Sequence, residues 1–131
     1  MIVVTQLYAG LLAVWFLVLS IRVVLGRAGK GKPSLGDGGD PVMFRRIRGQ
    51  ANFAEYVPLT LVLIGFLEMS GQAKWIIHLL GSTLLLGRVM HGYAFSFTSE
   101  HVFGRSAGIA LTFLSLGVAS ALCIFSSIAK L

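Results

Sequence analysis

The sequence predicts an all-α membrane protein: a bundle of four transmembrane helices in a single domain that covers residues 1–131. Its residues are 56% hydrophobic and only 12% charged, whereas soluble domains carry roughly 25% charged residues. Four apolar stretches are each long enough to cross a bilayer, which takes about 20 helical residues. Because four such helices use nearly the whole chain, we expect one domain with no soluble appendage.

The first helix is expected over residues 2–25, an apolar run interrupted by few polar side chains, among them Arg22. This run is too long for a cleaved signal peptide and lacks its basic start, so we expect it to stay in the mature protein. Arg22 has two readings: an anchor whose long stem reaches the interface, or a cation that faces a site. Its position alone favours the anchor. Residues 26–41 are dense in glycine and proline, which predicts a loop.

The second helix is expected from about residue 42 to residues 68–71. Asp40 is suited to cap its first turn and Pro41 to occupy that turn. Pro58 lies inside the helix and removes a backbone donor, so we expect a kink there.

The third and fourth helices are expected over residues 74–95 and 105–128. Small residues at a helix surface allow two backbones to approach closely. We expect such contacts at Gly81, Ser82, Gly87 and Gly92 of the third helix and at Gly108 and Gly117 of the fourth. The single cysteine, Cys123, lies in the last apolar run and is expected to be an inert buried thiol.

The basic residues are distributed unevenly between the two ends of the predicted bundle. Of the eleven lysines and arginines, nine fall at the end that holds the first and third loops: Arg22, Arg27, Lys30, Lys32, Arg45, Arg46, Arg48, Arg88 and Arg105. Lys74 and Lys130 fall at the other end. The positive-inside rule therefore places the nine in the cytoplasm and both termini outside. This topology accounts for the net charge of +6 without a nucleic-acid partner.

A polar stripe runs along the start of the second helix. Arg48, Asn52 and Glu55 are spaced i, i+4 and i+7, which puts them on one helical face. A cation, an amide and a carboxylate in a row suit a small zwitterion with several carboxylates and amides, or another helix. On the third helix, Arg88 and His91 share a face with Phe95, which lies seven residues after Arg88.

The stretch RGQANFAEYVP at residues 48–58, with these helices and loops around it, resembles the MAPEG family (membrane-associated proteins in eicosanoid and glutathione metabolism). The resemblance covers nearly the full chain in helix order and loop placement, and is strongest toward a bacterial, microsomal glutathione transferase-like branch. It implies a homotrimer in the bacterial inner membrane. It also implies glutathione as cosubstrate, bound between neighbouring subunits near the cytoplasmic face.

The resemblance further implies a detoxifying glutathione transferase that also has the chemistry for peroxide reduction. Its second substrate would be a lipophilic electrophile or lipid that arrives from the bilayer. The residues that it assigns to glutathione are Arg22, Arg48, Asn52, Glu55, Tyr56, Arg88, His91 and Tyr93. Arg105 and Ser106, at the expected start of the fourth helix, match the pair where thiol activation is placed. The chain departs from the family pattern at Phe95, where a tyrosine is common, and at Ala51, where some members have an arginine.

A second interpretation is a non-catalytic membrane scaffold, or a small channel or transporter, in which the polar stripe is structural. In a bundle, Arg48, Asn52 and Glu55 can satisfy one another without any ligand. No acidic series that would form a ring and no repeated half supports a pore. A metal site is not expected, because His78, His91 and His101 share no ligand spacing.

Overall fold

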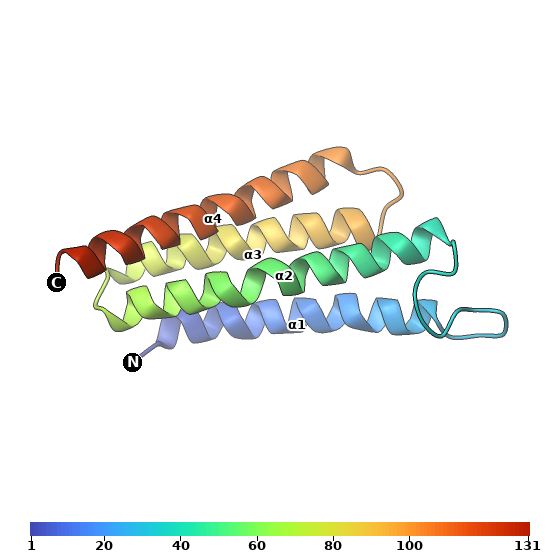
Figure 1. Cartoon of the computed structure of the whole chain (residues 1–131), viewed down its shortest axis with the longest axis horizontal. Coiled ribbons are helices and arrows are strands. Elements are labelled where there is room, and N and C mark those ends of the chain that lie inside the picture. Colours follow the sequence, from blue (N-terminus) through green and yellow to red (C-terminus); the bar gives the residue numbers. More distant parts are fainter.

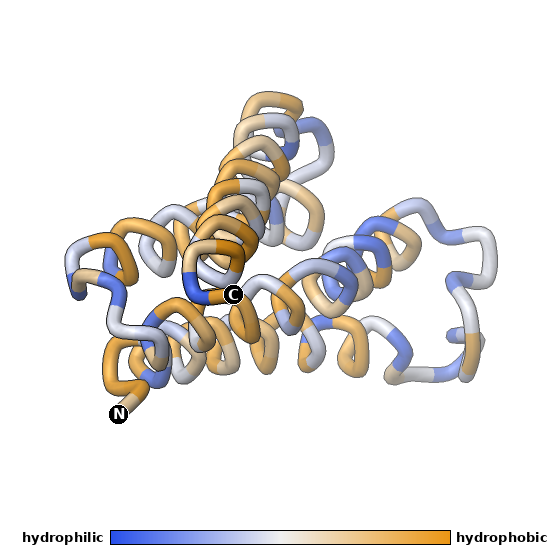
Figure 2. The backbone as a smooth tube through the Cα atoms, turned by 60° about the vertical axis from the view of Figure 1, so that its left-hand side comes forward, coloured by the Kyte–Doolittle hydropathy of each residue, from blue (hydrophilic) through white to orange (hydrophobic).

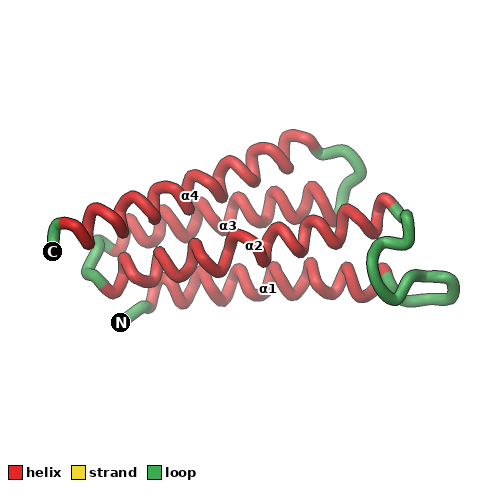
Figure 3. The backbone as a smooth tube through the Cα atoms, in the orientation of Figure 1, coloured by secondary structure: helices red, strands yellow, loops and turns green.

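The computed structural model describes all 131 residues and contains four α-helices and no strand. The helices are α1 (Val3–Gly26), α2 (Pro41–Met69), α3 (Lys74–Ser96) and α4 (Val102–Ile128). They run up and down in an antiparallel bundle (Figures 1 and 3). The two termini and the α2–α3 turn lie at one end, here called the terminal end. The α1–α2 and α3–α4 connections lie at the other, the loop end. The all-α prediction is confirmed.

Helix α3 is packed against all three other helices, whereas α1 and α4 do not touch. Helices α1, α2 and α4 have the length and hydropathy of membrane spans. The 23 residues of α3 span about 34 Å, enough to cross the hydrocarbon core, but α3 has no stretch as apolar as the spans of the other three helices. The lower hydropathy of α3 reflects Arg88 and His91, which α3 buries inside the bundle.

The outside of the bundle is largely apolar. Large hydrophobic side chains are exposed along α1 and α4, including Val14, Leu17, Phe113 and Phe125. Figure 2 shows hydrophobic residues along the helices and hydrophilic ones gathered toward the helix ends and loops. In water such a surface is unfavourable, but a bilayer solvates it. The chain is therefore built as an integral membrane protein.

Glycines bring α3 close to its neighbours. A Cβ atom on Gly108 of α4 would lie 2.6 Å from the amide nitrogen of His91 and 2.7 Å from the carbonyl oxygen of Gly87, so only glycine fits. The expected contacts at Gly87 and Gly108 are confirmed. The expectation for Gly117 is wrong, because no atom of another element lies within 4 Å of its Cβ position.

On its other side, α3 meets α1 through two further glycines. Gly81 lies against the ring of Tyr8, and Gly92 lies against Trp15 and Leu19. Both expected contacts are confirmed. Ser82 is exposed and its hydroxyl donates to the carbonyl of Leu79 in its own helix. It makes no interhelical contact, so that expectation is wrong.

The helix starts follow from local capping. Asp40 accepts a hydrogen bond from the amide of Val42 at 2.9 Å, and Pro41 is the first residue of α2, as expected. Helix α2 continues through Pro58. Helix α4 begins at Val102, three residues earlier than expected, because the His101 ring accepts from the amide of Gly104 at 2.9 Å and caps the first turn.

At the terminal end, the carboxylate of Glu68 on α2 caps the start of α1. Its two oxygens accept from the amides of Val4 and Thr5 at 2.8 and 2.7 Å. The residue before α1, Ile2, supplies no side-chain cap of its own. A carboxylate at a helix N-terminus also meets the positive end of the helix dipole. Glu68 therefore joins two helices by satisfying backbone donors that have no partner within α1.

The topology predicts the outcome of a reporter fusion. The two basic residues of the smaller set, Lys74 and Lys130, lie at the terminal end, and the remaining nine lie toward the loop end. We expect a reporter fused after Leu131 to be active on the extracytoplasmic side. Alkaline phosphatase and green fluorescent protein fusions report opposite sides and check each other. Activity of the cytoplasmic reporter alone would reverse the orientation.

The Glu68 cap predicts a stability effect. Glu68→Ala removes both acceptors, so we expect it to lower the free energy of unfolding by about 1–2 kcal/mol, the range of a lost helix cap. The measurement is the melting temperature of the purified protein in detergent. Glu100→Ala, in the α3–α4 loop, removes a carboxylate that makes no hydrogen bond or ion pair and serves as the control. Equal melting temperatures for both variants would show that α1 does not need this cap.

Candidate functional site

The centre of the site is Arg88 of α3, which is 1% exposed. Its Nη1 atom donates to the side-chain oxygen of Asn52 at 2.8 Å and to the Asn52 carbonyl at 3.3 Å. Its Nε and Nη2 atoms are buried and have no partner. No carboxylate forms an ion pair with it. A buried cation without a counter-anion is costly, so this arrangement favours an anion that is supplied from outside the chain.

An ion pair lies beside Arg88 on the outer face of α2. The guanidinium of Arg48 is 3.6 Å from the carboxylate of Glu55, and both side chains are nearly half exposed. Glu55 lies about 21 Å along α2 from Pro41, near the middle of the helix. Charged groups at that depth face protein or water rather than lipid. This face of α2 therefore lies against protein or water rather than against lipid.

One aromatic contact lies within α3, and a second joins α2 to α4. His91 is buried and stacks on Phe95, with ring centroids 4.7 Å apart. Tyr56 of α2 contacts Phe113 of α4, with centroids 5.3 Å apart. The structure thus gathers six of the residues predicted to bind glutathione. We call them the central cluster: Arg48, Asn52, Glu55, Tyr56, Arg88 and His91.

Arg105 and Ser106 lie on the first turns of α4, and both are exposed. Arg105 lines a small cleft of about 170 Å³ together with Arg45 and residues 99–102. The sequence predicts that the fourth helix begins at Arg105, and this is wrong. Because α4 begins at Val102, the Arg105 amide already donates to the carbonyl of His101 at 3.2 Å. The Arg105 guanidinium itself makes no hydrogen bond or ion pair and stays available to an anion.

The structure places Arg22 and Tyr93 apart from the central cluster. Arg22 donates to the hydroxyl of Ser96 at 2.9 Å and to the Ser96 carbonyl at 2.6 Å, and its guanidinium lies 3.8 Å from the centroid of the Phe97 ring. Tyr93 stacks on the same ring, with centroids 5.5 Å apart. Within one chain, both residues therefore lie on the side of α3 that faces α1, and neither joins Asn52 and Arg88.

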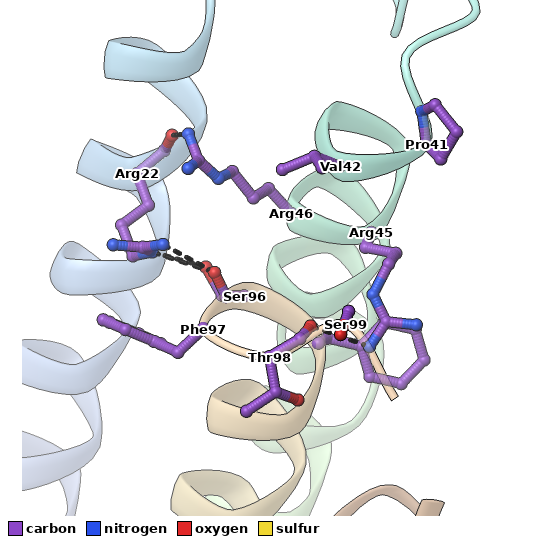
Figure 4. A pocket seen from close by; sticks show the side chains of 10 residues that line it. Arg22, Pro41, Val42, Arg45, Arg46, Ser96, Phe97, Thr98 and Ser99 are labelled. Carbon is purple, nitrogen blue, oxygen red and sulfur yellow. Dashed lines mark hydrogen bonds between the residues drawn. The ribbon is translucent and has the colours of Figure 1, made fainter. Parts of the chain in front are cut away.

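A second polar site lies at the loop end, where α1, α2 and α3 meet (Figure 4). It is a cleft of about 370 Å³, here called the basic cleft. Its lining combines three arginines with hydroxyl and apolar side chains: Arg22, Pro41, Val42, Arg45, Arg46, Phe95, Ser96, Phe97, Thr98 and Ser99.

Sequence reasoning missed this cleft. It used Arg45 and Arg46 only among the nine basic residues that set the predicted topology. The helical spacing did separate these arginines, however. At about 100° per residue, Arg46 lies about 160° around the helix from Arg48, so the two side chains lie on different faces. Ser96 and Phe97 carried no signal, because their role depends on where α1 packs.

The comparisons agree with this architecture. The model of the MAPEG family matches residues 5–125. The inner membrane protein YecN of Escherichia coli strain K12 is 40% identical to the chain over 92 residues, which make up 70% of this chain and 70% of YecN. YecN of Escherichia coli O6:H1 strain CFT073 matches to the same extent.

Proposed function

The chain belongs to the MAPEG family, and we propose that it is a membrane glutathione transferase that holds glutathione at the central cluster. The observation that carries this proposal is the buried guanidinium of Arg88, which has two nitrogens without partners and no carboxylate in contact. The family includes glutathione transferases, and glutathione brings the anion that this cation lacks.

The groups of glutathione match those of the central cluster in kind. Glutathione carries two carboxylates, one ammonium group, two peptide bonds and one thiol. Arg88 and Arg48 suit the two carboxylates, since a guanidinium binds a carboxylate bidentately. Glu55 suits the ammonium group, and Asn52 both donates to and accepts from a peptide bond. In the absence of ligand, Arg48 and Glu55 neutralise each other.

The exposed charges of α2 support an assembly of several subunits. The Arg48–Glu55 pair is half exposed near mid-helix, so a neighbouring subunit would shield it from lipid. We propose that the homotrimer implied by the family provides this cover. Arg22 and Tyr93 lie on the far side of α3, so they would reach the same glutathione only from the neighbouring subunit.

The proposed chemistry is activation of the thiol by Arg105. A free thiol has a pKa of about 8.5 and is mostly protonated at neutral pH. An unpaired guanidinium nearby favours the thiolate, and the hydroxyl of Ser106 donates to it. The thiol proton leaves to water, and the thiolate forms a bond to an electrophilic carbon. The displaced electron pair moves to the leaving group. Lipophilic electrophiles concentrate in the bilayer, which suits a site built on membrane helices.

Replacing Arg88 tests the binding site. We expect Arg88→Met to keep or raise the melting temperature without ligand, because an apolar side chain of similar length replaces an unpaired buried cation. The rise in melting temperature that glutathione causes should disappear. For the parent, glutathione at 100 times its dissociation constant should stabilise the fold by about 2.7 kcal/mol. Thermal unfolding in detergent measures both quantities.

The matched control is Arg27→Gln, which removes an arginine at the loop end whose guanidinium bonds only to the carbonyl of Gly36. It should respond to glutathione like the parent. Should Arg88→Met also respond like the parent, the polar stripe would be structural, as the Arg48–Glu55 pair permits.

Replacing Arg105 tests the chemistry. We expect Arg105→Ala to lower turnover with a test electrophile such as 1-chloro-2,4-dinitrobenzene by about tenfold or more, which corresponds to about 1.4 kcal/mol. Binding of glutathione should change much less. Ser106→Ala should show a smaller loss, because a neutral donor stabilises an anion less than a cation does. Thiolate absorbance in the ultraviolet gives an independent readout. Unchanged absorbance and turnover in Arg105→Ala would assign this arginine to membrane anchoring alone.

A further inference from the structure

The basic cleft concentrates positive charge that no carboxylate neutralises. Its three arginines come from two helices, and none of its ten lining residues is acidic. The two ion pairs of the chain, Lys32–Asp40 and Arg48–Glu55, involve none of these arginines. Two acidic residues are adjacent in sequence to this lining. Asp40 caps α2 through the amide of Val42 and pairs with Lys32. Glu100 lines a neighbouring cleft with Arg45 but forms no ion pair.

The arginines are held in place by neutral oxygens. Arg22 donates to Ser96, and Arg45 donates to the carbonyls of Ala94 and Thr98 at 2.7 and 3.1 Å. Arg46 reaches across to the Arg22 carbonyl at 3.3 Å (Figure 4). These bonds position the guanidinium groups without cancelling their charge. The Nε atoms of Arg45 and Arg46 are buried and have no partner at all.

The walls of the cleft have two characters. Ser96, Thr98 and Ser99 contribute hydroxyl groups, and Phe97 and Val42 contribute apolar surface. Arg22 lies against the Phe97 ring, which fixes the plane of its guanidinium. Planar, fixed guanidinium groups beside hydroxyl donors are the groups that bind phosphate oxygens.

The position of the cleft fits an anion at the membrane surface. Helix α1 ends at Gly26 and α2 begins at Pro41, so the cleft lies at the ends of two spanning segments, where lipid headgroups lie. The α2 N-terminus contributes the positive end of its helix dipole, while α1 and α3 end here and contribute negative ends. Clustered basic residues at this level attract anionic lipids.

We propose that the basic cleft is a binding site for a phosphate-bearing anion, distinct from the central cluster of the same chain. Its phosphate contacts are assigned to Arg45 and Arg46, because Arg22 would also serve the glutathione proposed to bind to a neighbouring subunit. The phosphate oxygens take the Nη1 donor of Arg45 and the Nη2 donor of Arg46, which make no hydrogen bond and are not buried. The apolar walls accept the part of the ligand next to the phosphate. The phosphate belongs either to an anionic phospholipid or to a soluble compound, and the experiment separates these two sources.

The experiment compares the melting temperature of the purified protein in detergent with three probes. These are phosphatidylglycerol, phosphatidylcholine as a zwitterionic lipid, and inorganic phosphate at the same ionic strength as a chloride control. Stabilisation by phosphatidylglycerol alone identifies a lipid site. Stabilisation by inorganic phosphate as well identifies a site for soluble phosphate compounds. If no probe stabilises the parent beyond its control, the arginines only cap helix ends and the proposal fails.

Variants assign the effect to the cleft. Arg46→Gln and Arg45→Gln should each weaken binding of the active probe by about tenfold, the loss of one charge-assisted contact. Arg27→Gln removes the same charge at the same end outside the cleft and should bind like the parent. Parent-like binding by both cleft variants would overturn the proposal.

A further variant separates binding from folding. Val42→Glu puts a carboxylate into the cleft at the second position of α2, where an acidic side chain favours the helix. It should therefore keep the parent melting temperature without ligand and lose the response to the probe. A parent-like response in this variant would also contradict the site.

Discussion

The buried guanidinium of Arg88 is the constraint around which the bundle is arranged. A cation in a membrane interior needs polar partners within the protein, because lipid supplies none. Asn52 supplies two oxygens from α2. Gly87, next to Arg88 in the chain, lets α4 approach through Gly108, where no other residue fits. The polar centre is thereby enclosed by three helices, and two donors of Arg88 remain buried without a partner.

At both ends of the bundle, charged side chains bond to backbone groups at a helix end, and the charges at the two ends are opposite. At the terminal end, the carboxylate of Glu68 accepts from two amides at the start of α1. At the loop end, Arg22 and Arg45 donate to carbonyls at or just beyond the end of α3. Each charge matches the sign of the helix end that it meets. These bonds tie neighbouring helices where the unpaired backbone groups of helix ends require partners.

The bundle therefore contains two kinds of arginine site. Arg88 is enclosed among side chains, whereas the arginines of the basic cleft are held by carbonyls and open to the membrane surface. The first arrangement suits the proposed binding of a small zwitterion between helices, and the second suits a phosphate at the interface. Arg105 belongs to neither arrangement. It lines a small cleft together with Arg45, and its guanidinium makes no hydrogen bond or ion pair.

The sequence by itself determined the all-α membrane fold, because four long apolar stretches in a chain of low charge leave no other way to satisfy the backbone in a bilayer. The i, i+4, i+7 spacing also placed Arg48, Asn52 and Glu55 on one face, since helical periodicity is local. Only the tertiary structure decided which helix each arginine meets. Arg22, an arginine on an apolar helix, lies with Arg46 and Ser96 rather than with Arg88, because the glycines of α3 set how closely α1 and α4 pack on its two sides. The start of α4 was likewise decided by the His101 cap, whose ring nitrogen becomes an acceptor only once the loop has folded back onto Gly104.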